Sequence, residues 1–254
     1  MAVTRVEKGN AVTNSQRTND ALQAEAAALA SRMQHTIISN VLTEKLWEAH
    51  IDECLKYGFN AAMVPGAWVK RTAERLRGTK VRVASFIDFP YGTMTSAGKA
   101  SEAGYLVEDG AQEIDLMPNV GCLLSGMEKE YRDDIAAVVK AAGSVPVKIM
   151  LELPLLNEQQ QKRAVALSIE AGVAYLKNAS GGAVGVATPE QIRFLRQLAP
   201  PNVRVKASGG IKTAQQLRDL LAAGADLAGT SSGVRIIQEV LEQPVAASQP
   251  VSNY

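Results

Sequence analysis

The sequence predicts an α/β protein that folds as one (β/α)8 barrel spanning residues 1–254, and three observations lead to this prediction. The length of 254 residues is typical of a single barrel of this kind. From Met33 onward, short β-branched or apolar runs alternate with longer amphipathic segments, as in βαβ units on a parallel sheet. Eight such short runs can be counted, and eight strands close a barrel.

The elements follow in order after an N-terminal extension that covers residues 1–32. Residues up to Asp20 are polar and turn-rich, and residues 21–33 have the alanine-rich composition of an extra helix before the barrel. We expect the last residues, 243–254, to form a flexible tail because they carry prolines and small polar residues. The eight predicted strands are residues 33–38, 59–64, 81–87, 113–117, 145–152, 173–177, 203–207 and 226–229, with helices between them at residues 44–57, 97–109, 131–142 and 158–171 among others.

Glycines stop several of these helical segments, which supports the strand count more than any single strand does. Glycine is suited to the C-terminal end of a helix because it readily adopts the left-handed conformation that ends a helix. An open doubly wound sheet would show the same alternation, but it needs a G-x-G-x-x-G turn after its first strand, and residues 39–41 lack one. The helix-stopping glycines are Gly58, Gly110, Gly143, Gly172 and Gly224.

The composition excludes several classes of partner and cofactor. Twenty-seven basic residues against 26 acidic ones give no net charge that would attract nucleic acid or an anionic membrane. No apolar run approaches the roughly 18 residues of a membrane span, and no signal-peptide pattern opens the chain. Cys54 and Cys122 have no disulfide or metal-ligand spacing, and two histidines are too few for the usual zinc sites. We therefore expect a cytoplasmic protein, in which any metal-dependent chemistry would have to rest on carboxylates.

Three charged residues near predicted strand ends carry the chemistry. The side chains of Asp115, Lys177 and Lys206 should meet at one mouth of the barrel, where the carboxyl ends of parallel strands converge. Two neighbouring ammonium groups would depress each other's pKa, and a lysine kept partly neutral can attack an aldehyde to form an imine. Asp115 would then carry protons, directly or through a water molecule. The alternative is a structural ion pair that fills the top of the barrel.

Glycine and hydroxyl residues follow the last three predicted strands. Loops at this position commonly bind phosphate through backbone N–H groups near helix N-termini, so we expect a small phosphorylated substrate. The alternative is ordinary turn and N-cap chemistry, for which the same residue types are suited. The candidate phosphate-binding residues are Gly181, Ser208, Gly209, Gly210, Gly229, Ser231 and Ser232.

From about Met33 to Val240 the sequence resembles the deoxyribose-phosphate aldolase family. The most specific segments are V-R-V-K-A-S-G-G-I-K-T, G-T-S-S-G-V and Q-E-I-D-L-M-P-N-V-G, supported by F-P-Y-G and V-K-I-M-L-E. The resemblance implies a class I aldolase that condenses acetaldehyde with glyceraldehyde 3-phosphate reversibly, giving 2-deoxyribose 5-phosphate, without a cofactor. It places Lys177 at the Schiff-base lysine, Lys206 at the lysine that tunes it, and Asp115 at the proton-relay aspartate. It also implies a role in proton transfer for the terminal Tyr254.

The sequence departs from the family pattern at four positions that we expect to line the mouth. Gln34 and His35 stand where the family has an aspartate shortly before a threonine. Met63 replaces a common cysteine, and Asn178 opens a loop that is usually richer in hydroxyl groups. Two alternatives therefore stay open: a related class I aldolase with another donor or acceptor, and a barrel that binds a phosphorylated metabolite without turning it over. The sequence does not determine whether the chain forms a homo-oligomer.

Overall fold

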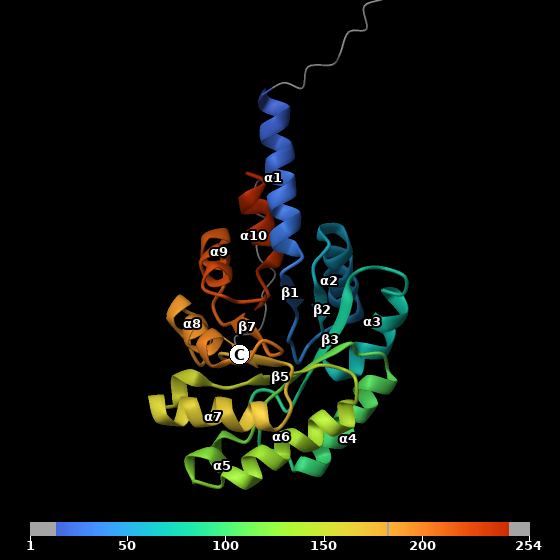
Figure 1. The fold of residues 1–254 in the computed structure, drawn as a ribbon. Helices are drawn as coiled ribbons and strands as arrows, with labels where there is room; N and C mark the ends of the chain where they lie inside the picture. The colour runs from blue at the N-terminus through green and yellow to red at the C-terminus, as the bar shows by residue number, and fades with distance from the viewer. Residues whose placement is uncertain (1–13, 182, 244–254) are drawn as a thin grey trace, which may run out of the picture.

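The computed structural model describes residues 14–181 and 183–243, and it confirms the predicted (β/α)8 barrel. Eight parallel strands pair in sequence order, and the last pairs with the first to close the sheet. Helices cover the outside of the barrel (Figure 1). The strands are β1 (Met33–Thr36), β2 (Ala61–Met63), β3 (Arg82–Ile87), β4 (Glu113–Leu116), β5 (Val147–Met150), β6 (Tyr175–Lys177), β7 (Arg204–Ser208) and β8 (Leu227–Thr230).

The helices agree with the predicted segments within a few residues. The helix predicted over residues 44–57 is α2, which starts at the N-cap Thr43 and ends at Gly58, whose φ of 65° is left-handed. The α-helices are α1 (Asn14–Ala30), α2 (Glu44–Tyr57), α3 (Val69–Arg75), α4 (Ser96–Glu108), α5 (Val120–Leu124), α6 (Glu128–Ala142), α7 (Glu158–Glu170), α8 (Pro189–Leu198), α9 (Ala214–Ala222) and α10 (Gly233–Val240). Two 3-10 helices are η1 (Gly66–Trp68) and η2 (Leu153–Leu155).

The extra N-terminal helix exists, but the prediction of a turn-rich stretch up to Asp20 is wrong for residues 14–20. These residues belong to α1, which runs beside α10 and projects beyond the barrel (Figure 1). The N-terminal part of α1 is polar because Asp20 and its neighbours are exposed, whereas Ala26, Leu29 and Ala30 in the C-terminal part are buried. The predicted tail lies outside the described residues, apart from Gln243.

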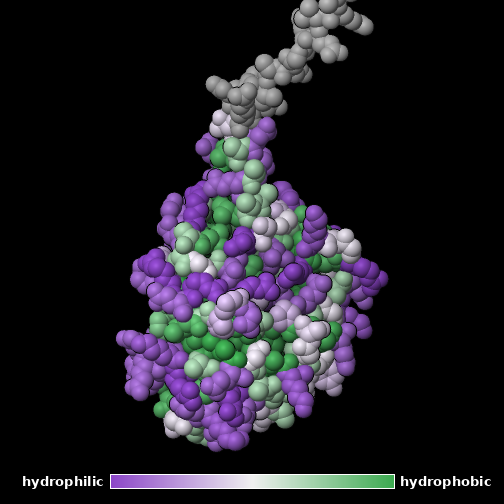
Figure 2. Space-filling view, in the orientation of Figure 1, coloured by the Kyte–Doolittle hydropathy of each residue, from purple (hydrophilic) through white to green (hydrophobic). Residues whose placement is uncertain are grey.

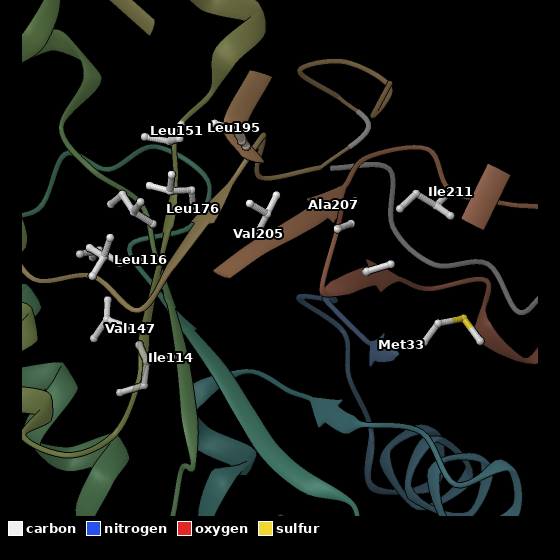
Figure 3. Close-up of a cluster of buried hydrophobic side chains, with 14 of the residues drawn as sticks. Met33, Ile114, Leu116, Val147, Leu151, Leu176, Leu195, Val205, Ala207 and Ile211 are labelled. Atoms are coloured by element: carbon white, nitrogen blue, oxygen red, sulfur yellow. The ribbon is translucent and has the colours of Figure 1, made fainter. Parts of the chain in front are cut away.

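The apolar core lies between the strands and the helices. Figure 3 shows side chains of this core, including Ile114 and Leu116 of β4 and Val205 and Ala207 of β7. On the visible outer face, polar side chains cover most of the surface, with apolar side chains between them (Figure 2). Because successive residues of a strand point to opposite sides of the sheet, the neighbours of these apolar residues face the barrel interior.

Candidate active site

A network of charged side chains fills the interior of the barrel. Gln34 on β1 contacts Glu113 on β4 and Lys206 on β7, and neither strand is a neighbour of β1, so these contacts cross the interior. Glu113 and Asp115 lie two residues apart on β4 and share this face. The six interior residues, Gln34, Glu113, Asp115, Lys148, Lys177 and Lys206, are all buried.

Asp115 holds the two candidate lysines together. Its Oδ2 atom accepts hydrogen bonds from Lys177 Nζ at 2.8 Å and from Lys206 Nζ at 2.7 Å. The two lysines are also direct cross-strand partners, since Lys177 of β6 pairs with Lys206 of β7. Lys148 Nζ lies 3.3 Å from the other carboxylate oxygen, Oδ1. Three cationic side chains therefore surround a single carboxylate.

A second ionic layer lies next to the first and is built on Glu113. Its Oε2 atom lies 2.6 Å from Lys148 Nζ, and its Oε1 atom accepts a 2.6 Å hydrogen bond from Arg82. Gln34 joins the two layers: its Nε2 donates to Glu113 Oε2 at 2.5 Å, and its Oε1 accepts from Lys206 at 2.5 Å. The network therefore runs continuously from Arg82 to Lys177.

The electrostatic balance shifts the pKa values of three of these groups. Burial lowers the pKa of Lys206 to about 7. The negative charge of Asp115 opposes this shift, whereas the positive charges of Lys177 and Lys148 add to it. Burial alone would raise the pKa of Asp115, but the surrounding lysines hold it well below its usual value. The pKa of Glu113 falls to about 2 although burial opposes the shift, since Lys148, Arg82 and Gln34 favour its ionised form. Lys206 can therefore exchange a proton near neutral pH while both carboxylates stay ionised.

A cavity of about 770 Å³ opens above this network. Lys177, Lys206 and Asp115 form part of its wall, together with residues of the glycine-rich loops after β6, β7 and β8. Lys177 is 6% exposed and Lys206 only 1%, so Lys177 is the more accessible of the two amines. All seven residues proposed from the sequence for phosphate line the cavity: Gly181, Ser208, Gly209, Gly210, Gly229, Ser231 and Ser232.

The loop after β6 is tied down beside Lys177. Glu152 follows β5 in a left-handed backbone conformation, with a φ of 51°, and its buried carboxylate accepts a hydrogen bond from the Ser180 backbone N–H. Burial raises the pKa of Glu152, although this hydrogen bond and Lys177 oppose the shift. Asn178 bonds the backbone of Ser208 through both its amide atoms, at 2.8 and 3.0 Å, which links the loop to β7.

The expectation that Gln34, His35, Met63 and Asn178 all line the mouth is half right. His35 and Met63 line the cavity. Gln34 and Asn178 are fully buried and do not, because Gln34 points into the ionic network and Asn178 points at β7. Tyr254, to which the resemblance assigns a proton-transfer role, lies outside the described residues.

One group of side chains has the composition of a metal site. Ligand atoms of His35, His50 and Glu53 lie within 4.8 Å of one another. However, His35 Nε2 is already 2.9 Å from Glu53 Oε2, and the two imidazole rings are stacked at 4.7 Å with an angle of 20° between their planes. The in-plane lone pairs of stacked rings do not converge on one ion, so this group is a hydrogen-bonded stack at the cavity wall.

Sequence reasoning missed three of the six interior residues: Gln34 as the link between the two layers, Glu113 and Lys148. The sequence held a signal for one of them, because Glu113 lies two residues before Asp115 and so shares the strand face that leads to the mouth. Lys148 lies two residues before Met150, which only the structure places at the cavity. Both cysteines are free, and no helix in the described part of the chain could span a membrane.

Comparison with known proteins adds a family assignment to this geometry. The model of the DeoC/LacD family of aldolases matches residues 34–239. The deoxyribose-phosphate aldolase of Brevibacillus brevis is 40% identical over 205 residues, which cover 81% of this chain and 93% of that protein. The corresponding protein of Geobacillus sp. is 39% identical, with 83% and 95% covered. The structure of the Aeropyrum pernix deoxyribose phosphate aldolase is similar with a TM-score of 0.77 and 30% identity, over 87% of this chain and 96% of that one.

Proposed function

The chain belongs to the DeoC/LacD family of aldolases, and we propose that it cleaves 2-deoxyribose 5-phosphate reversibly into acetaldehyde and glyceraldehyde 3-phosphate through a Schiff base on Lys177. The observation that carries the proposal is the pair of buried lysines that share the Oδ2 atom of Asp115 at the floor of the cavity. In a structural ion pair, one carboxylate balances the charge of one lysine. Here two lysines share one carboxylate oxygen, so the charge of one lysine is not balanced and its amine is available for reaction.

The cleavage begins at the aldehyde carbon of the open-chain sugar. The neutral amine of Lys177 adds to this carbon to form a carbinolamine, and loss of water gives the protonated imine. A base then removes the proton of the C3 hydroxyl, the C2–C3 bond breaks, and its electron pair moves to the imine to form an enamine. Glyceraldehyde 3-phosphate leaves at this stage. Protonation of the enamine carbon and hydrolysis of the resulting imine release acetaldehyde and restore the amine.

Lys206 and Asp115 are suited to the proton transfers of this sequence. A group whose pKa is about 7 is present in both protonation states at neutral pH, which favours general acid–base catalysis. Asp115 stays ionised, and its Oδ2 contacts both amines, so it can orient them and pass a proton between them through a water molecule. We therefore assign the proton exchange to Lys206 and Asp115 together, with Lys177 as the nucleophile.

The glycine-rich wall of the cavity is suited to the phosphate group. Gly181, Gly210 and Ser231 belong to three loops that line the cavity, and α10 begins at Gly233 directly after Ser232. The N-terminus of a helix of this length attracts an anion through its free N–H groups and its dipole. Lys212 and Arg235 also line the cavity and add positive charge.

The compartment and the assembly state are part of the same proposal. We infer a cytoplasmic enzyme, which is supported by two free cysteines and by the absence, among the described helices, of one that could span a membrane. A homo-oligomer is supported by the Aeropyrum pernix relative, whose structure is described as tetrameric. Size-exclusion chromatography with light scattering determines which assembly this chain forms.

Borohydride trapping tests the central step. Reduction in the presence of acetaldehyde should add an ethyl group to Lys177, as found by peptide mass mapping, and the Lys177→Met variant should lose both the adduct and the turnover while its melting temperature stays close to that of the wild type. An adduct on another lysine, or turnover without an adduct, would overturn the Schiff-base assignment. Rates with 2-deoxyribose 5-phosphate, ribose 5-phosphate and unphosphorylated deoxyribose identify the substrate and test whether the glycine loops bind phosphate.

A further inference from the structure

Lys206 has an unusual set of neighbours inside the barrel. Its Nζ atom has one anionic acceptor, Asp115 Oδ2 of β4, which it shares with Lys177 of β6. Lys148 of β5 adds a second cation to its surroundings. The remaining strands next to Lys206 supply no negative charge: β8 offers Gly229, and β1 offers the neutral amide of Gln34. Glu113 of β4 lies beyond Gln34 and is held by Lys148 and Arg82.

The amide of Gln34 can be oriented in only one way in this position. Its Oε1 accepts from Lys206, while its Nε2 donates to Glu113 Oε2 and, at 3.3 Å, to Asn60 Oδ1. A flipped amide would place N–H groups against an ammonium and oxygen against a carboxylate. Glutamine is therefore a residue that satisfies both neighbours, because a carboxylate at this position would face Glu113 and a hydrocarbon would remove one hydrogen bond from Lys206 and one from Glu113.

We propose that Gln34 is a positioning residue for the reaction: it holds Lys206 by a hydrogen bond without adding a negative charge, so that Asp115, shared with Lys177, stays its anionic partner and Lys206 can accept the proton that Lys177 gives up before it attacks the aldehyde. The proposal rests on the proposed function, since a base at this place matters only if an imine forms beside it. Burial and the two neighbouring lysines disfavour the ammonium form of Lys206, and Gln34 adds no negative charge that would oppose them.

Gln34→Glu and Gln34→Met separate charge from packing. Glu adds a carboxylate at nearly the same length, and an opposite charge this close favours the ammonium form by about one pH unit or more. Met keeps the length but removes the acceptor, so the ammonium form loses a partner. We expect the acid limb of kcat/KM to move to higher pH in Gln34→Glu and to stay or move to lower pH in Gln34→Met. A purely structural role would slow both variants without moving their limbs in opposite directions.

A second measurement does not depend on turnover. Lysine labelled with 13C at the ε-carbon reports the titration of each ammonium group by NMR, and the resonance missing from Lys206→Met identifies Lys206. We expect its midpoint to lie near neutral pH in the wild type, to fall or stay in Gln34→Met, and to rise in Gln34→Glu, or in the shorter Gln34→Asp if the Glu variant does not fold. A wild-type midpoint close to that of an exposed lysine, or equal midpoints in the neutral and acidic variants, would overturn the role of Gln34. Absence of the Lys177 adduct in the wild type would instead overturn the proposed function.

Discussion

Replacing Gly229 by alanine should damage the site through a single added methyl group. Gly229 lies on β8 against Lys206, and a Cβ atom at this position would be 3.1 Å from Lys206 Cε, 3.6 Å from Ser208 Oγ and 3.7 Å from Lys206 Nζ. Carbon atoms in contact usually stay about 3.5–4.0 Å apart, so the end of the Lys206 side chain must move by roughly 0.5 Å. This movement strains the hydrogen bonds of Lys206 to Asp115 and Gln34, which measure 2.7 and 2.5 Å.

The expected loss in kcat/KM is about 10-fold, since a misplacement of about 1 Å in a catalytic group can cost about 100-fold. The assay is the initial rate of 2-deoxyribose 5-phosphate cleavage across neutral pH, together with a thermal melt. Gly104→Ala is the matched control, because Gly104 lies in α4 with no atom within 4 Å of the new methyl group. It should keep its rate and gain roughly 0.5–1 kcal/mol in unfolding free energy. A fully active Gly229→Ala enzyme would refute the argument that Lys206 must keep its present position.

Two further predictions concern stability. Lys99 is fully buried, and its Nζ contacts Asp134 at 2.7 Å and Asp88 at 3.3 Å, so Lys99→Met leaves buried carboxylates without a cation and should lower the unfolding free energy by about 3–5 kcal/mol in urea titrations. Lys162→Met, in an exposed pair, should change it little. The pKa of Glu113 drops from 4.5 to about 2 in the folded state. Ionised Glu113 therefore adds up to about 3 kcal/mol to the unfolding free energy above pH 4.5, and this contribution is lost as the pH falls toward 2. Glu113→Gln should therefore be less stable at neutral pH and show a shallower fall in acid; an unchanged acid profile would contradict this account.

The fold could be predicted from the sequence because each element carries its own signal. The helix at residues 44–57 has the bounds that the sequence predicts, and Gly58 marks its end in both. The prediction for the start of α1 is wrong because no such signal marks it. The segment before Asp20 is polar, and polarity does not distinguish an exposed helix from a loop. Helix ends marked by caps are predictable, whereas exposed helix ends are not.

The site could be predicted only in part. Asp115, Lys177 and Lys206 belong to predicted strands, and the barrel closure alone brings their strand ends to one mouth. The position of Gln34 depends on which face of β1 turns inward and on which interior layer it reaches, and both follow from the strand register rather than from local sequence. The link that Gln34 makes to Lys206 is therefore visible only in three dimensions.

The alternation of side chains along each strand explains how one barrel supports both stability and reactivity. On β4, Ile114 and Leu116 belong to the apolar core while Glu113 and Asp115 face inward. The outward face supplies the apolar burial that stabilises the fold, so the interior is left to carry ions whose desolvation costs several kcal/mol each. That same desolvation lowers the pKa of Lys206. Replacing buried ion pairs by apolar residues of similar volume is often neutral or stabilising, but it would remove the amine that the proposed imine mechanism needs. The ionic network is therefore expected to serve catalysis more than folding.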